Sequence, residues 1–122
     1  MKFSAREDIN APIQEVFDAV TDFVAFERQI LNRGATLTRH PDRTPRLGTS
    51  WDAGFVFRGR KRAVNAKVAA LEEPNLLVID LVSDGLTGQF RVDLLPLSAQ
   101  TTRMTTSLEL SASTLTARLL LQ

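Results

Sequence analysis

Residues 49–71, "TSWDAGFVFRGRKRAVNAKVAAL", hold two runs of alternating apolar and polar side chains on either side of a glycine. Trp51, Ala53, Phe55 and Phe57 are the apolar positions before Gly59, and alternating Val and Ala positions follow it. A period of two residues is typical of a strand with one buried face. A short turn with glycine joins antiparallel neighbours. This stretch therefore predicts a long β-hairpin.

The tip of this hairpin, "RGRKR" at residues 58–62, is basic at four of its five positions. Such a cluster either keeps a turn solvated and discourages edge pairing, or it binds an anion. Nucleic-acid sites usually add exposed aromatic side chains that stack on bases, whereas Phe55 and Phe57 have the parity of the apolar face. The net charge of +1 also lacks the basic excess of a nucleic-acid binder. We expect a solvated turn and no nucleic-acid partner.

Similar alternation extends in both directions from the hairpin. Further strands are expected within residues 2–10, 35–40, 75–84, 86–99 and 100–111. Short turns separate most of them, for example near Pro74 and at Asp84-Gly85. Short turns imply antiparallel neighbours. The first strand and a six-stranded meander make a curved antiparallel sheet of about seven strands, with one apolar face that must be covered.

Two short helices are expected between the first strand and the meander. In "NAPIQEVFDAVTDF", residues 10–23, the apolar residues Ile13, Val16, Phe17 and Val20 have helical spacing. A second helix is expected at residues 24–30, with Gly34 ending that segment. A C-terminal helix begins in "STLTARLLLQ", residues 113–122. The expected fold class is therefore α+β.

The composition limits the chemistry that the chain can support. The 122 residues suit one domain, 1–122. No apolar run is long enough to span a membrane, and no signal peptide precedes the first strand, so a cytoplasmic protein is expected. Cysteine is absent and His40 is the only histidine, which argues against metal ligands and nucleophilic catalysis. The sequence has no glycine-rich phosphate loop, so no cofactor is expected.

Glu7 is the one charged residue on the apolar side of the first strand. If it is desolvated, its pKa would rise and it could act as an acid or base. Otherwise it lies at a bulge or at an open end and reaches water. Thr102 and Thr106 also have inward parity, and they could either bind a ligand or be satisfied locally.

Large apolar side chains gather on one face of the expected sheet. They are most simply core residues, but pockets for apolar ligands are lined in the same way. The candidate cavity residues are Phe17, Trp51, Phe55, Phe57, Val68, Ile79, Phe90, Met104 and Leu108.

The order of elements resembles the helix-grip fold of the START-like, birch-pollen-allergen-like superfamily, also called SRPBCC. The stretches that carry the resemblance are "INAPIQEVFDAVTDF", "LGTSWDAGFVFRGR" and "VAALEEPNLLVIDL". Polyketide cyclase/dehydrase-type and lipid-transport domains are the most similar members. The resemblance implies a curved sheet around a long C-terminal helix, with a cavity for a lipid, sterol, quinone or polyketide.

This sequence departs from the superfamily at its C-terminal end. Its last helix stops at Gln122, about three turns after its start. We therefore expect an incomplete C-terminal helix, or a groove that a second copy of the chain covers.

Three functions agree with these observations. The favoured hypothesis is non-enzymatic binding or transport of a hydrophobic small molecule. The first alternative is a polyketide cyclase/dehydrase-like enzyme that uses Glu7 as its acid or base. The second is a protein-interaction module of the co-chaperone kind.

Overall fold

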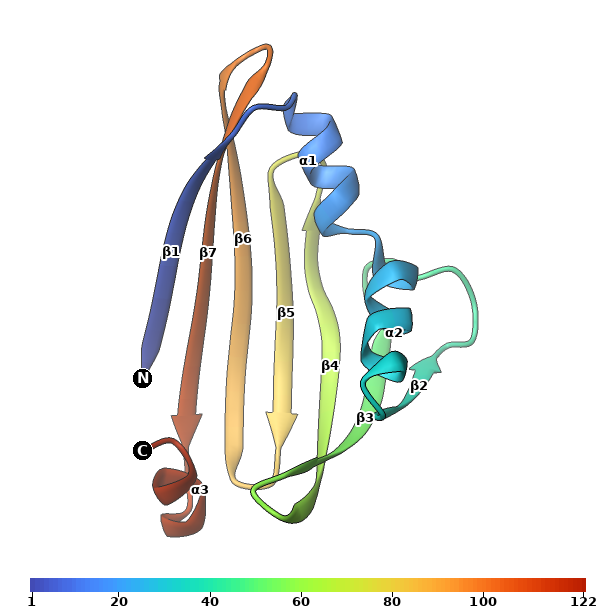
Figure 1. Ribbon diagram of the computed structural model, residues 1–122, viewed down its shortest axis with the longest axis vertical. Helices are drawn as coiled ribbons and strands as arrows, with labels where there is room; N and C mark the ends of the chain where they lie inside the picture. The colour runs from blue at the N-terminus through green and yellow to red at the C-terminus, as the bar shows by residue number, and fades with distance from the viewer.

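The computed structural model describes residues 1–122 as one seven-stranded sheet with three helices (Figure 1). In chain order the elements are β1 (Lys2–Ile9), α1 (Ile13–Val20), α2 (Phe23–Asn32), β2 (Thr36–His40), β3 (Ser50–Phe57), β4 (Arg60–Glu72), β5 (Leu76–Ser83), β6 (Leu86–Ser98), β7 (Thr101–Ala112) and α3 (Leu115–Leu120).

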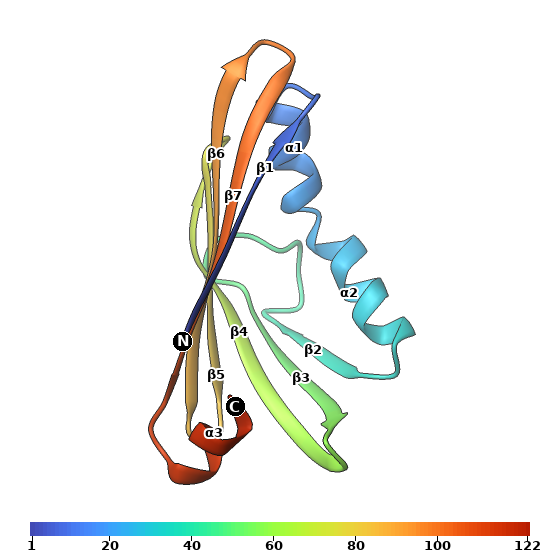
Figure 2. The same ribbon diagram turned by 60° about the vertical axis from the view of Figure 1, so that its left-hand side comes forward.

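All neighbouring strands are antiparallel, and the sheet order is β1-β7-β6-β5-β4-β3-β2. The first strand therefore pairs with the last, and the rest follow as a meander. Register shifts in β4 between Val68 and Ala70, and in β6 between Pro96 and Ser98, add local bends. Figure 2 shows the resulting curved sheet with α1 and α2 on the same side of it. The predicted α+β helix-grip architecture is confirmed.

The β3–β4 connection is the predicted hairpin. Its two turn residues, Arg58 and Gly59, have φ values of 52° and 75°. Positive φ at both central positions is the mark of a type I′ turn, whose twist matches that of the flanking strands. Phe57 pairs with Arg60 directly beside the turn. The basic residues therefore lie at a hairpin tip, as the sequence indicates.

Local signals set the ends of the two N-terminal helices. Pro12, with φ fixed at −59°, directly precedes α1. The carboxylate of Asp22 caps α2 by accepting a hydrogen bond from the Ala25 amide at 3.2 Å. Gly34, at φ +88°, follows α2 in the left-handed conformation. The second helix is longer than the expected residues 24–30.

The core is centred on α1 and the strands beneath it. The buried apolar cluster consists of Val16, Phe17, Trp51, Val68, Leu77, Val92 and Leu94. Full burial of side chains of this size contributes about 1.5–3 kcal/mol each. This packing fixes one end of the helical layer on the sheet.

The C-terminal helix α3 forms at the expected place, but it lies at one end of the sheet (Figure 1). The carbonyl of Gly85, in the β5–β6 turn, accepts a hydrogen bond from the Ser113 amide at 2.8 Å. The carbonyl of Gln122 is 3.5 Å from Arg58 Nη2 at the β3–β4 tip. Leu115 and Leu119 are exposed on this helix. No helix in the structure is long and apolar enough to cross a membrane.

Candidate functional site

An apolar cavity of about 430 Å³ lies between α2 and the concave face of the sheet. Fifteen residues line it, and 13 of them are hydrophobic: Val20, Phe23, Phe26, Glu27, Ile30, Leu37, Trp51, Ala53, Ala66, Leu77, Ile79, Phe90, Val92, Met104 and Thr106. This volume falls within the roughly 300–1,000 Å³ of small-molecule sites, which are also mostly apolar with few polar groups. The cavity has the size and lining of a site for an apolar ligand.

The helix side of the cavity follows from the sequence of α2. Phe23, Phe26 and Ile30 lie three and four residues apart and share one helix face. Glu27 lies on the same face, between Phe26 and Ile30, and it is the only charged residue in the lining. Helical geometry therefore directs this carboxylate toward the sheet rather than toward water.

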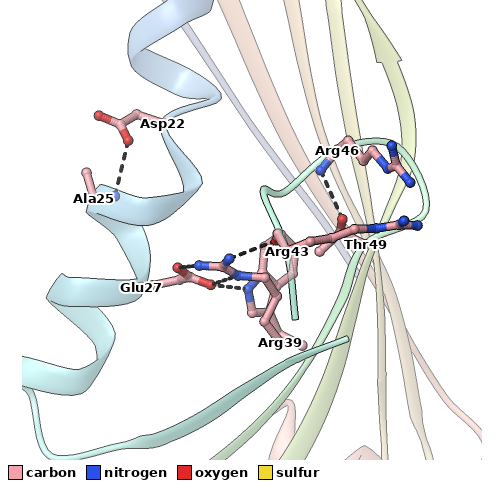
Figure 3. A network of polar contacts seen from close by, with 8 residues as sticks. Asp22, Ala25, Glu27, Arg39, Arg43, Arg46 and Thr49 are labelled. Carbon is pink, nitrogen blue, oxygen red and sulfur yellow. Dashed lines mark hydrogen bonds and ion pairs between the residues drawn. The ribbon is translucent and has the colours of Figure 1, made fainter. Parts of the chain in front are cut away.

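Glu27 bridges α2 to β2 and β3 (Figure 3). Its Oε2 accepts hydrogen bonds from Arg39 Nε and from Trp51 Nε1, both at 2.7 Å. Its Oε1 accepts a second hydrogen bond from Arg39, through Nη2. Arg39 also donates from Nη1 to the carbonyl of Arg43, at 2.8 Å. The two charged side chains thus form a bidentate pair that is tied to both layers.

The electrostatics of this pair follow from its hydrogen bonds. Donation by Arg39 holds the pKa of Glu27 below its ordinary value of 4.5, with a smaller contribution from Trp51, although burial acts in the opposite direction. The same hydrogen bonds raise the pKa of Arg39. The Glu27 side chain is only 14% exposed. The cavity wall therefore holds a carboxylate that stays ionised at neutral pH beside its counter-ion.

Trp51 is held in one orientation at the cavity wall. Its indole N–H is bonded to Glu27, and its ring lies 5.4 Å from the ring of Phe23, centroid to centroid, in a tilted arrangement. The side chain is almost fully buried. Trp51 is also the only tryptophan in the chain, so its fluorescence reports on this cavity alone.

The sequence-predicted cavity residues separate into groups. Trp51, Ile79, Phe90 and Met104 line the cavity. Phe17 and Val68 lie in the packed core beside it. Leu108 lines a smaller hollow of about 150 Å³ near β1, which it shares with Phe90 and Thr106.

Phe55 and Phe57 do not line the cavity, contrary to the prediction. They are 37% and 44% exposed, because they lie near the tip of the β3–β4 hairpin, opposite Arg62 and Arg60, and outside the cavity lining. Alternation along the strand predicts which face of the sheet these rings lie on. It does not predict how much of that strand lines the cavity.

Glu7 is exposed, which contradicts the desolvation that an acid or base role requires. Its parity is as expected, because it pairs with the cavity residue Met104. β1 is an edge strand, however, and no element covers Glu7 there. Water therefore reaches its carboxylate.

The two inward threonines have different roles. Thr102 is fully buried, and its hydroxyl donates to the carbonyl of Ala11 at 2.8 Å, so it is satisfied locally. Thr106 lines the cavity and also the smaller hollow near β1. The exposed surface of the cavity wall is almost entirely apolar.

Sequence reasoning missed Glu27 and Arg39. Two signals were present: Glu27 interrupts the apolar face of α2, and Arg39 shares the inward parity of Leu37 in β2. Opposite charges on the apolar faces of α2 and β2 predict an ion pair between Glu27 and Arg39, but only if α2 is known to pack over β2. The arrangement of α2 over β2 was the missing information.

Polar side chains also lie together at two places outside the cavity. A polar hollow of about 460 Å³ lies on the outer face of the sheet and includes Asp80, Gln89 and Glu109. His40 Nε2 lies 2.9 Å from Asp52 on an exposed surface. No group of three or more His, Asp or Glu side chains is placed to hold a metal ion.

Comparisons with known proteins give a consistent fold. No family model matches the chain, and no curated protein matches its sequence. The truncated norcoclaurine synthase from Thalictrum flavum aligns with a TM-score of 0.71 and 14% identity over 93% of this chain and 76% of that one. The Zhui aromatase/cyclase from Streptomyces sp. R1128 aligns with a TM-score of 0.70 and 8% identity, over 93% and 69%. A START superfamily protein from Mycobacterium smegmatis aligns with a TM-score of 0.66 and 18% identity, over 93% and 79%.

The chain has the START-like helix-grip fold. The resemblance inferred from the sequence is thus confirmed for the architecture. At such low identities the similarity is one of fold, and an activity has to be argued from the cavity itself. None of the residues of α3 lines the cavity.

Proposed function

We propose that the protein binds a hydrophobic small molecule, as a carrier, in the cavity between α2 and the sheet. The observation that supports this most strongly is the lining: 13 of 15 residues are hydrophobic around about 430 Å³ of space. Burial of apolar ligand surface there is favourable by roughly 25 cal/mol per Å². Lipids, quinones and polyketide-like molecules are the ligand classes that this lining suits. The absence of cysteine is compatible with a cytoplasmic carrier.

The cyclase- or dehydrase-like alternative has weaker support. An acid or base needs a pKa close to the working pH and a position facing the substrate. Glu7 is exposed, and Glu27 is held ionised by Arg39, with both of its oxygens occupied. Glu27 therefore lacks the environment of a proton donor at neutral pH, and Glu7 lies outside the cavity lining.

Interaction with a second copy is supported by a separate observation. The exposed rings of Phe55 and Phe57 and the leucines of α3 leave apolar surface at one end of the molecule. We expect sedimentation velocity to show concentration-dependent association, which Phe57→Ser weakens. A monodisperse monomer at high concentration would exclude this role.

Native mass spectrometry of the protein isolated from cells tests the carrier proposal. We expect a fraction of the protein to carry a bound molecule of a few hundred daltons, as for drug-sized ligands. The variant Ala66→Leu, which narrows the cavity, should be isolated without it. Equal amounts of the molecule on both proteins would place it outside the cavity.

A further inference from the structure

The charged pair at the cavity wall is complete without a ligand. Both oxygens of Glu27 accept hydrogen bonds, from Arg39 and Trp51, and Arg39 also donates to the backbone at Arg43. Glu27 is the only charged lining residue, and its counter-ion Arg39 is paired with it but does not line the cavity. The wall therefore presents almost no net charge to a bound molecule.

This arrangement penalises charged ligands of either sign. A carboxylate headgroup would meet the carboxylate of Glu27 and could reach Arg39 only by displacing it. An ammonium group would have to compete with a bidentate guanidinium for Glu27. A charge placed among the apolar residues without a partner loses its hydration and gains nothing in return.

We propose that the cavity selects uncharged hydrophobic molecules, because Glu27 and Arg39 neutralise each other at its wall. The lining around this pair exposes almost only apolar surface, which offers no partner to a charged headgroup. The ligand class is thus a long-chain alcohol, ketone or similar neutral molecule rather than a fatty-acid anion. This inference rests on the proposed carrier function and adds its specificity.

Trp51 fluorescence measures this selectivity directly, because the only tryptophan lines the cavity. Three probes with the same alkyl chain, 1-dodecanol, dodecanoate and dodecylammonium, are titrated at neutral pH below their micelle concentrations. We expect the alcohol to bind about tenfold or more tightly than either ion, which is a difference of about 1.4 kcal/mol. Calorimetric titration gives the same affinities without depending on the tryptophan signal.

Two substitutions should change the preference in opposite directions. Glu27→Gln keeps an acceptor for the Trp51 indole but leaves Arg39 without its counter-ion, so the affinity for dodecanoate should rise about tenfold. Arg39→Gln leaves Glu27 uncompensated and should raise the affinity for dodecylammonium by a similar factor. Affinity for the neutral alcohol should change little in either variant.

Asp8→Asn is the matched control. Asp8 forms a bidentate pair with Arg103, at 2.9 and 3.2 Å, on the outer face of β1 and β7. Asp8→Asn also leaves an arginine, Arg103, without its counter-ion, but at a site outside the cavity. The order of affinities for the three probes should therefore stay that of the wild type.

The outcomes separate the inference from the proposed function. If the wild type binds dodecanoate as tightly as dodecanol, charge selection is wrong while the carrier function stands. If the folded wild type binds none of the probes, the carrier function fails and the inference fails with it. If folded Glu27→Gln binds the three probes in the same order of affinity as the wild type, the proposed role of the Glu27–Arg39 pair is wrong. This comparison remains decisive even if Arg39→Gln does not fold.

Discussion

Glu27 connects α2 to β2 and β3 through hydrogen bonds, on the side of the helical layer away from the core. α1 is held by buried apolar side chains, whereas α2 has no fully buried residue. The hydrogen bonds from Arg39 and Trp51 to Glu27 therefore add to the packing of Phe23 in attaching α2 to the sheet. A cavity can persist beneath α2 because polar contacts hold the helix at its edge, while apolar packing does not fill the space.

The stability of the protein should depend on pH through Glu27. Its folded pKa lies below the ordinary value of 4.5, so its contribution is fully present above that value and is lost as the pH falls through the folded pKa. At neutral pH, Glu27→Gln should lower the free energy of unfolding by about 1–2 kcal/mol. Below pH 4.5 the difference from the wild type should shrink. Urea unfolding at several pH values measures it, and a difference that does not change with pH would contradict this role.

The β5–β6 turn packs against α3 at one end of the sheet. Gly85 has φ +70°, and a Cβ at this position would lie 2.5 Å from Thr114 Oγ1 and 3.2 Å from the Ala117 Cβ. The same Thr114 oxygen caps α3 through the Ala117 amide at 3.1 Å. Gly85 is therefore required both by the β5–β6 turn and by the packing of α3 against it.

Gly85→Ala should destabilise α3 selectively. The left-handed backbone costs about 1–2 kcal/mol for any residue with a Cβ, and the clash with Thr114 adds to it. Gly59→Ala is the control, because Gly59 also has positive φ but nothing lies within 4 Å of its added Cβ. Hydrogen exchange should show faster exchange in α3 for Gly85→Ala alone. Equal protection of α3 in the two variants would show that Gly85 does not hold this helix.

The basic hairpin tip should contribute little to stability or binding. Arg58, Arg60, Lys61 and Arg62 lie at or next to the turn, and replacing all four with glutamate should change the free energy of unfolding by less than about 1–2 kcal/mol, because exposed charges contribute little. The parent protein should bind duplex DNA only weakly at physiological salt. Fluorescence anisotropy that showed tight binding, with a steep dependence on salt, would contradict this because the slope counts phosphate contacts.

For the whole molecule, the fold was predictable because its signals are local and repeated. Alternation around Gly59, helical spacing from Ile13 to Val20 and short turns each specify one element, and together they leave few topologies. The extent of the cavity was less predictable, because it depends on where α2 lies over the sheet. Trp51 and Phe90 line it as expected, but Phe57 does not, whereas Glu27 lines it from α2 itself.

The central claim is that the space beneath α2 is an open cavity for a ligand rather than part of a packed core. Ala66 lies on β4 in the cavity wall, and Ala63 lies on the same strand but is exposed. Replacing Ala66 with leucine should fill part of an open cavity with little change in stability, whereas overpacking a filled core costs about 1–3 kcal/mol. Ala63→Leu controls for leucine in this strand.

The most direct test is to measure the affinity for dodecanol, by Trp51 fluorescence, together with the melting temperature of Ala66→Leu. We predict that Ala66→Leu loses affinity about tenfold or more, which is about 1.4 kcal/mol, while its melting temperature stays close to those of the wild type and Ala63→Leu. A sharply lowered melting temperature in Ala66→Leu, with dodecanol bound by neither the wild type nor Ala63→Leu, would contradict the claim and show that the space is a filled core.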